Sequence, residues 1–174
     1  MNNFMFDTVV FNRILDGSVS VTQFKAGLKF YATHIQEDEL NNTPASDRRE
    51  RLAHIFTSFI GRKFPTESTM IDVSGLGESK LGTGGVIPTE TMVWGVGRWG
   101  QGKWGADGGS YVAIKSRLDD LKKKENNVQD ALIAETAIRN KFCLVTDDKT
   151  LRAVAQEFCG TAISFQEFLK EAIG

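Results

Sequence analysis

Short apolar segments alternate with helical patterns at both ends of this chain, and this alternation restricts the fold more than any other feature. The clearest apolar run covers residues 142–146, between helical patterns at residues 128–139 and 151–158. Further strands are predicted at residues 4–6, 29–32 and 161–163. Strands that alternate with helices in this way predict an α/β fold with a central, mainly parallel sheet.

Two predicted helix starts carry a capping box, in which a hydroxyl side chain precedes a Glu or Gln by three residues. Thr33 and Gln36 form the first box, and Ser164 and Glu167 form the second. Apolar residues at helical spacing predict an amphipathic helix over residues 52–60. Further helices are predicted at residues 9–15, 22–28 and 111–124.

The middle of the chain has a different composition from its flanks. Thirteen of the 17 glycines lie between residues 61 and 109, and the three tryptophans lie at positions 94, 99 and 104. The sequence therefore predicts one domain over residues 1–174, with a Gly- and Trp-rich insertion at about residues 62–110.

Charge and cysteine content limit the class of protein. The 21 basic and 22 acidic residues nearly balance, which excludes a strongly basic nucleic-acid binder of the histone kind. Two cysteines do not make a disulfide framework. The N-terminal residues lack the pattern of a signal peptide, and no apolar run approaches the roughly 18 residues that span a bilayer. We therefore expect a soluble, cytoplasmic protein without a membrane partner.

The insertion contains a five-residue repeat rather than a nucleotide-binding loop. The sequences WGVGR, WGQGK and WG follow one another from Trp94 to Gly105, and no helical pattern follows their GxGxxG matches. Three roles stay open for this repeat. It could stack on single-stranded RNA beside basic residues, pack against the body or a partner chain, or form a lid over a cleft.

Four acidic residues are predicted where strands end or helices begin. Asp7 and Asp148 follow two predicted strands, and the carboxyl ends of parallel strands meet at one edge of a sheet. Asp130 lies in the first turn of a predicted helix, and Glu39 lies on the helix after the second strand. Gathered carboxylates repel one another, and Mg²⁺ or Mn²⁺ relieves this repulsion by taking oxygen ligands. Because such ions activate water for phosphodiester hydrolysis, the four acids predict a metal-dependent nuclease site.

Four short segments resemble, in the same order, the motifs of PIN domains, a family of metal-dependent nucleases that includes the VapC-type toxins of bacterial toxin–antitoxin pairs. Thr33 precedes the second of these segments, which are FDT at 6–8, DEL at 38–40, DALIAETA at 130–137 and LVTDD at 144–148. The resemblance covers roughly residues 1–51 and 119–171, and the insertion has no counterpart in it.

The resemblance implies a PIN-like three-layer α/β/α fold and an endoribonuclease that hydrolyses RNA with bound Mg²⁺ or Mn²⁺. Its catalytic and metal-binding residues would be Asp7, Glu39, Asp130 and Asp148, and Thr146 would support the site through hydrogen bonds. The resemblance further implies an antitoxin protein and a second copy of the chain as partners. The extra length, compared with a compact toxin, leaves an RNA-processing role open.

Two departures from the family pattern affect this assignment. Many PIN domains have Asn where this chain has Val9. The doublet Asp147–Asp148 leaves two candidates for one ligand, of which we choose Asp148 because the family pattern is Thr, one variable residue, then Asp. Each acid also has a simpler explanation: a turn former or helix cap for Asp7 and Asp148, the partner of a helix dipole for Asp130, and a solvated helix face for Glu39.

The remaining charged residues are given simpler roles. Glu135 and Asp38 are expected to be surface acids, and the lysines at 122–124 are expected to form a solvated helix end. Basic residues that could hold a phosphate backbone are Arg13, Lys149 and Arg152.

Two other functions compete with the nuclease hypothesis. A non-catalytic PIN-like module that binds RNA or protein would share the fold, and the loss of an acidic residue would favour it. A phosphate-accepting receiver-like domain also gathers acids at strand ends. It needs a central Asp and a downstream strand-end Lys, for which the sequence offers no good match.

Overall fold

The computed structural model describes residues 2–17, 19–70, 78, 86–87, 109–122 and 127–173. Its strands are β1 (Asn3–Phe6), β2 (Lys29–Tyr31), β3 (Thr69–Met70), β4 (Val86–Ile87), β5 (Cys143–Val145) and β6 (Thr161–Ile163). Its α-helices are α1 (Thr8–Asp16), α2 (His34–Asn41), α3 (Ser46–Phe59), α4 (Gly109–Leu121), α5 (Asn127–Arg139), α6 (Lys149–Glu157) and α7 (Phe165–Ala172).

Four of the strands form an all-parallel sheet in the order β2-β1-β5-β6. In the centre of this sheet, Phe6 of β1 is in register with Val145 of β5. The two central strands therefore end side by side at one edge. This arrangement confirms the predicted α/β fold with a parallel sheet.

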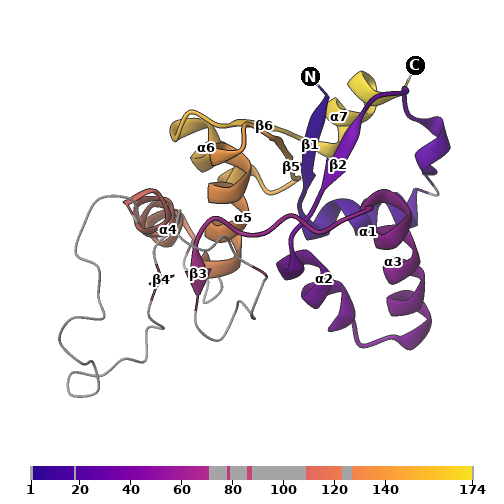
Figure 1. The fold of residues 1–174 in the computed structure, drawn as a ribbon, viewed down its shortest axis with the longest axis horizontal. Helices are drawn as coiled ribbons and strands as arrows, with labels where there is room; N and C mark the ends of the chain where they lie inside the picture. The colour runs from indigo at the N-terminus through magenta and orange to yellow at the C-terminus, as the bar shows by residue number, and fades with distance from the viewer. Residues whose placement is uncertain are drawn as a thin grey trace.

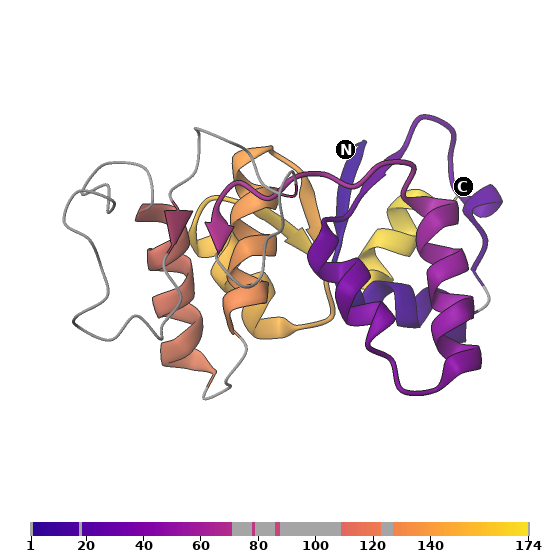
Figure 2. The same ribbon diagram turned by 60° about the horizontal axis from the view of Figure 1, so that its bottom comes forward.

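Alternate residues of the central strands enter two hydrophobic clusters on opposite faces of the sheet. Phe4, Phe6 and Val145 pack with residues of α1, α3 and α7. Met5 and Leu144 pack with residues of α5 and α6. Helix α4 packs against α5 and α6. Figures 1 and 2 show that these two groups of helices lie on either side of the sheet.

Aromatic packing fixes the end of β1. The ring centroid of Phe6 lies 5.1 Å from the centroids of Phe30 and Phe168, and the rings of Phe4 and Phe168 are 5.0 Å apart. Buried aromatic pairs contribute about 0.5–1.5 kcal/mol each beyond the burial of their surface. The residue that follows Phe6 therefore leaves the sheet from a well-anchored position.

Both predicted capping boxes are confirmed. The Thr33 hydroxyl accepts the Ile35 N–H while Gln36 closes the box at the start of α2. Ser164 and Glu167 do the same at the start of α7. These local signals set helix starts correctly because each one satisfies backbone N–H groups that have no partner within the helix.

The helix predicted at residues 22–28 is wrong. Its residues form only the end of a short 3-10 turn, Val21–Gln23, which Ser20 caps. Phe24 is extended, forms an antiparallel bridge with Ile173 and places its ring among the aromatic residues of the core. Gly27 then turns the chain with a φ of +88°. The tertiary packing of Phe24 therefore sets the conformation of this segment.

The predicted insertion is described only in part. Its strands β3 and β4 pair in parallel, and the Trp/Gly repeat at residues 94–105 lies outside the described residues. Within the described ranges, no helix combines the length and apolar character needed to cross a membrane.

Candidate metal centre

Asp7 lies at the edge of the sheet, between the end of β1 and the start of α1. Its backbone N–H donates to the Val145 carbonyl at 3.0 Å. Its carboxylate caps α1 by accepting the Thr8 N–H at 2.7 Å, and it accepts the Thr146 hydroxyl at 2.6 Å. The Thr146 hydroxyl in turn accepts the Asp148 N–H at 3.0 Å. Thr146 therefore links the two strand ends through hydrogen bonds.

The environment of Asp7 disfavours its charge. Burial is the largest effect and raises the pKa of Asp7 to about 7, with further increases from the charges of Asp130 and Glu39. Hydrogen bonds from Thr146 and Thr8 lower the pKa but do not offset burial. A cation placed beside this carboxylate would favour its charged form.

Glu39 approaches Asp7 through Thr8. The Thr8 hydroxyl donates to the Glu39 carboxylate, while the Thr8 backbone N–H donates to Asp7. Burial raises the pKa of Glu39, the Thr8 hydrogen bond lowers it, and the charge of Asp130 raises it further. Helix α2 is held at this edge because the Gln36 side-chain amide donates to the Phe6 carbonyl at 2.9 Å.

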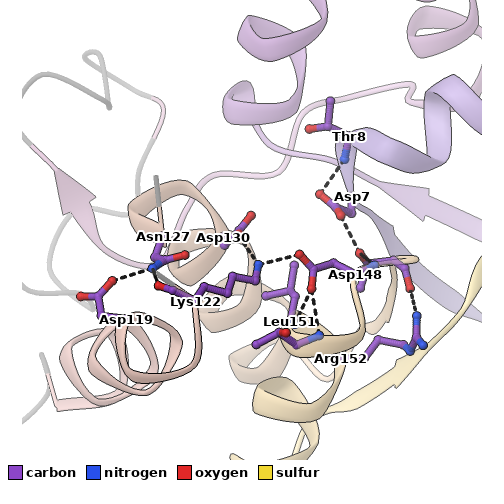
Figure 3. A network of polar contacts seen from close by, with 11 residues as sticks. Asp7, Thr8, Asp119, Lys122, Asn127, Asp130, Asp148, Leu151 and Arg152 are labelled. Carbon is purple, nitrogen blue, oxygen red and sulfur yellow. Dashed lines mark hydrogen bonds and ion pairs between the residues drawn. The ribbon is translucent and has the colours of Figure 1, made fainter. Parts of the chain in front are cut away.

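Asp130 and Asp148 share a lysine. The Lys122 Nζ lies 2.7 Å from the Asp130 carboxylate and 2.6 Å from the Asp148 carboxylate. Figure 3 shows the Lys122 side chain extending between the two acids. Burial alone lowers the pKa of Lys122, but the hydrogen bonds to both acids outweigh it and raise the pKa above its ordinary value.

Asp148 also caps a helix. Its second carboxylate oxygen accepts the N–H groups of Thr150 and Leu151 at 2.9 and 3.0 Å, at the start of α6. Burial raises the pKa of Asp148, but the Lys122 ion pair and these backbone hydrogen bonds lower it below its ordinary value. The proposed simpler role of Asp148 as a helix cap is therefore present together with its contact to Lys122.

Asp147 belongs to a different set of contacts. Its carboxylate accepts from the Arg13 guanidinium at 3.0 Å and from the Phe165 N–H at 3.1 Å, at the start of α7. Asp148, and not Asp147, is therefore the member of the doublet that shares a cation with Asp130.

The fold brings the predicted acids to one edge of the sheet, but it does not arrange them as a complete set of metal ligands. Across the described ranges, no three Asp, Glu, His or Cys side chains lie close enough to make a ready metal-binding group. The charges of Asp130 and Glu39 raise the pKa of Asp7, and the charge of Asp130 raises the pKa of Glu39. Lys122 joins Asp130 to Asp148. The donor chemistry fits Mg²⁺ or Mn²⁺, because carboxylate oxygens are the ligands these ions prefer.

Sequence reasoning missed two residues of this site. Lys122 was expected in a solvated helix end, and Thr8 was given no role. The signal for Lys122 is the short connection between two packed helices, which brings the end of α4 beside the first turn of α5. Thr8 had only the general signal of a hydroxyl next to a strand-end acid.

The structure also defines the exposure and contacts of the other charged residues considered from the sequence. Glu135 is fully buried and accepts the Ser110 hydroxyl at 2.8 Å, so its prediction as a surface acid is wrong. Asp38 is exposed, as expected. Among the candidate phosphate-holding residues, Lys149 is exposed and Arg152 donates to the Thr146 carbonyl at 2.6 Å.

Comparison of the sequence with protein-family models and with curated proteins gives no match.

Proposed function

We propose that this protein is a metal-dependent endoribonuclease with a PIN-like three-layer α/β/α fold, in which carboxylates at the sheet edge hold Mg²⁺ or Mn²⁺. The parallel sheet with helices on both faces supports this fold assignment. The four acids in PIN-like order along the chain support the chemistry.

One observation carries the proposal: the Asp7 carboxylate is buried at the edge of a parallel sheet, beside other carboxylates. The exposed fraction of residue Asp7 is 8%, and the pKa of its carboxyl group is raised to about 7. Burying a carboxylate without a compensating cation is costly. A position of this kind is typical of a functional site, because folding alone gains nothing from the raised pKa.

The residues of the chain have distinct roles in this proposal. Asp7 and Glu39 would hold the metal ion, with Asp130 completing the acidic edge. Thr8 and Thr146 orient the first two of these groups by donating hydrogen bonds. A bound Mg²⁺ or Mn²⁺ supplies Lewis-acid chemistry, since it lowers the pKa of water and neutralises charge on the scissile phosphate.

The biological setting is proposed from the resemblance to PIN domains. RNA is the substrate, the compartment is the cytoplasm, and the protein acts as the toxin of a type II toxin–antitoxin pair. An antitoxin protein and a second copy of the chain are then its partners.

The second candidate function is a non-catalytic PIN-like module that binds RNA or protein. The ion pairs of Lys122 favour it, because they neutralise two of the four acids without any metal. Direct metal binding separates the two candidates.

The test is the cleavage of a mixed pool of single-stranded and structured RNA by the full chain with Mg²⁺, Mn²⁺ or EDTA. We expect metal-dependent cleavage by the wild type and a loss of at least about 100-fold in Asp7→Asn, since even outer-shell changes cost 10–100-fold in metal affinity. Asp147→Asn is the matched control, because this neighbouring acid contacts Arg13 and the start of α7, and it should cleave like the wild type. Well-folded protein that neither cleaves RNA nor binds Mn²⁺ would favour the binding module.

A further inference from the structure

The backbone of Lys122 is fixed beside α5. Its N–H donates to the Leu118 carbonyl at 2.7 Å, which continues the hydrogen-bond pattern of α4. Its carbonyl accepts from the Asn127 side chain at 3.2 Å, and the same amide donates to Asp119 at 2.7 Å. Figure 3 shows this arrangement at the junction of the two helices. The backbone of Lys122 is therefore fixed by hydrogen bonds, and Lys122 is not part of a solvated helix end.

The side chain of Lys122 is committed to two acids from different elements. Asp130 lies in the first turn of α5 and Asp148 lies at the start of α6. The N–O distances, 2.7 and 2.6 Å, lie at the short end of the range for charge-assisted hydrogen bonds. The side chain is only 9% exposed, so water screens these contacts much less than it screens surface pairs.

Asp148 has little capacity left for another cation. One of its oxygens accepts two N–H groups of α6, and the other contacts the ammonium. A divalent ion at Asp148 would have to displace a largely buried ammonium and leave it without its partner. Breaking a buried pair in this way is strongly unfavourable.

We propose that Lys122 is a built-in cation of this site: its ammonium takes the place of a second metal ion between Asp130 and Asp148. This inference rests on the proposed function. The protein then binds a single divalent ion beside Asp7 and Glu39, and Asp148 is a positioning residue that anchors Lys122. Asp148 is not a metal ligand in this arrangement.

The test is the number of Mn²⁺ ions bound by the full chain, measured by isothermal titration calorimetry after removal of metals with EDTA. We expect one ion per chain for the wild type and two for Lys122→Met, which opens the position between Asp130 and Asp148. Lys63→Met is the matched control, because Lys63 also forms a 2.6 Å ion pair, with Glu37, but is much more exposed. It should bind one ion.

Asp148→Asn gives a second measurement that does not depend on the folding of Lys122→Met. Asn also caps helices well, so the start of α6 is retained. We expect one bound ion, because this carboxylate is not a ligand.

Four outcomes would overturn the inference. Two ions in the wild type, or a bound ion lost in Asp148→Asn, would show that Asp148 holds metal, and the proposed function would stand. A single ion in Lys122→Met would show that the lysine excludes nothing. No Mn²⁺ in the wild type, together with no RNA cleavage, would remove the proposed function as well.

Discussion

The acidic edge of the sheet has two halves, in which the negative charge of the carboxylates is compensated differently. In the half formed by Asp130 and Asp148, the chain supplies its own cation, and the pKa of Asp148 is lowered. In the half formed by Asp7 and Glu39, only hydroxyl and backbone N–H groups contact the acids among the described residues, and both pKa values are raised. Four carboxylates on one edge therefore do not have equal roles.

This difference indicates where an external cation would act. Binding of a metal ion is most favourable where negative charge is buried and uncompensated, and it is least favourable where an ammonium is already present. Removing a charge should consequently have opposite effects in the two halves. Removing the charge of Lys122 should destabilise the folded protein, whereas removing the charge of Asp7 should stabilise it.

The largest effect is expected for Lys122→Met without metal. The substitution leaves Asp130 and Asp148 close together without their shared cation. We expect a loss of about 3 kcal/mol in the free energy of unfolding, at the low end for a broken buried pair because both acids are partly exposed. Urea unfolding at pH 7.5 in EDTA measures this loss.

Lys63→Met sets the scale for that measurement. Its ion pair with Glu37 lies at the surface, so its removal should cost about 0–1 kcal/mol. Equal losses in the two variants would show that the Lys122 contacts are ordinary surface pairs.

Asp7→Asn should have the opposite sign. Its folded-state pKa of about 7 lies above the ordinary value of 3.8, so the unfolded chain releases this proton first as the pH rises. The Asp7 contribution that favours folding is therefore fully present below about pH 4 and is lost as the pH rises to about 7. At pH 8 in EDTA, we expect the variant to exceed the wild type by about 2 kcal/mol, since each unit of pKa corresponds to about 1.4 kcal/mol. Part of the gain is lost because Asn has a single acceptor oxygen and cannot accept from both Thr8 and Thr146 as the Asp7 carboxylate does.

The pH series is the decisive part of this experiment. Unfolding curves from pH 4 to pH 8 should show a gain for Asp7→Asn that grows with pH. A difference between variant and wild type that does not change with pH would contradict the raised pKa of Asp7.

The sequence predicted most of the fold because its strongest signals are local. The capping boxes at Thr33 and Ser164 place two helix starts, and the apolar run at residues 142–146 contains β5. The failure at residues 22–28 has a non-local cause. Phe24 is extended because it packs with rings from β2, α3 and α7, which no pattern of nearby residues reveals.

The acids of the site could be predicted from the sequence, but the lysine that compensates two of them could not. Asp7 and Asp148 could be placed from strand ends alone, because parallel strands bring their carboxyl ends together. The position of Lys122 depends on how α4 packs against α5. The short connection between the two helices indicates that they are neighbours, but it does not reveal which side chains meet. The burial of Glu135 follows from the same packing, since its partner Ser110 lies at the start of α4.

A smaller stability effect than those of Lys122→Met and Asp7→Asn is expected for Thr8→Val, which is also the finest test of the metal-binding half. Valine keeps the size of the side chain and the backbone N–H that donates to Asp7, but it removes the hydroxyl that donates to Glu39. We expect a loss of about 1 kcal/mol in stability and about a tenfold weaker affinity for Mn²⁺, because hydrogen bonds to a ligand orient it. Calorimetric titration checks the affinity, and Thr8→Ser, which retains the hydroxyl, should restore it. An unchanged affinity in Thr8→Val would mean that Glu39 takes no part in holding the ion, and the asymmetry between the two halves would then rest on Asp7 alone.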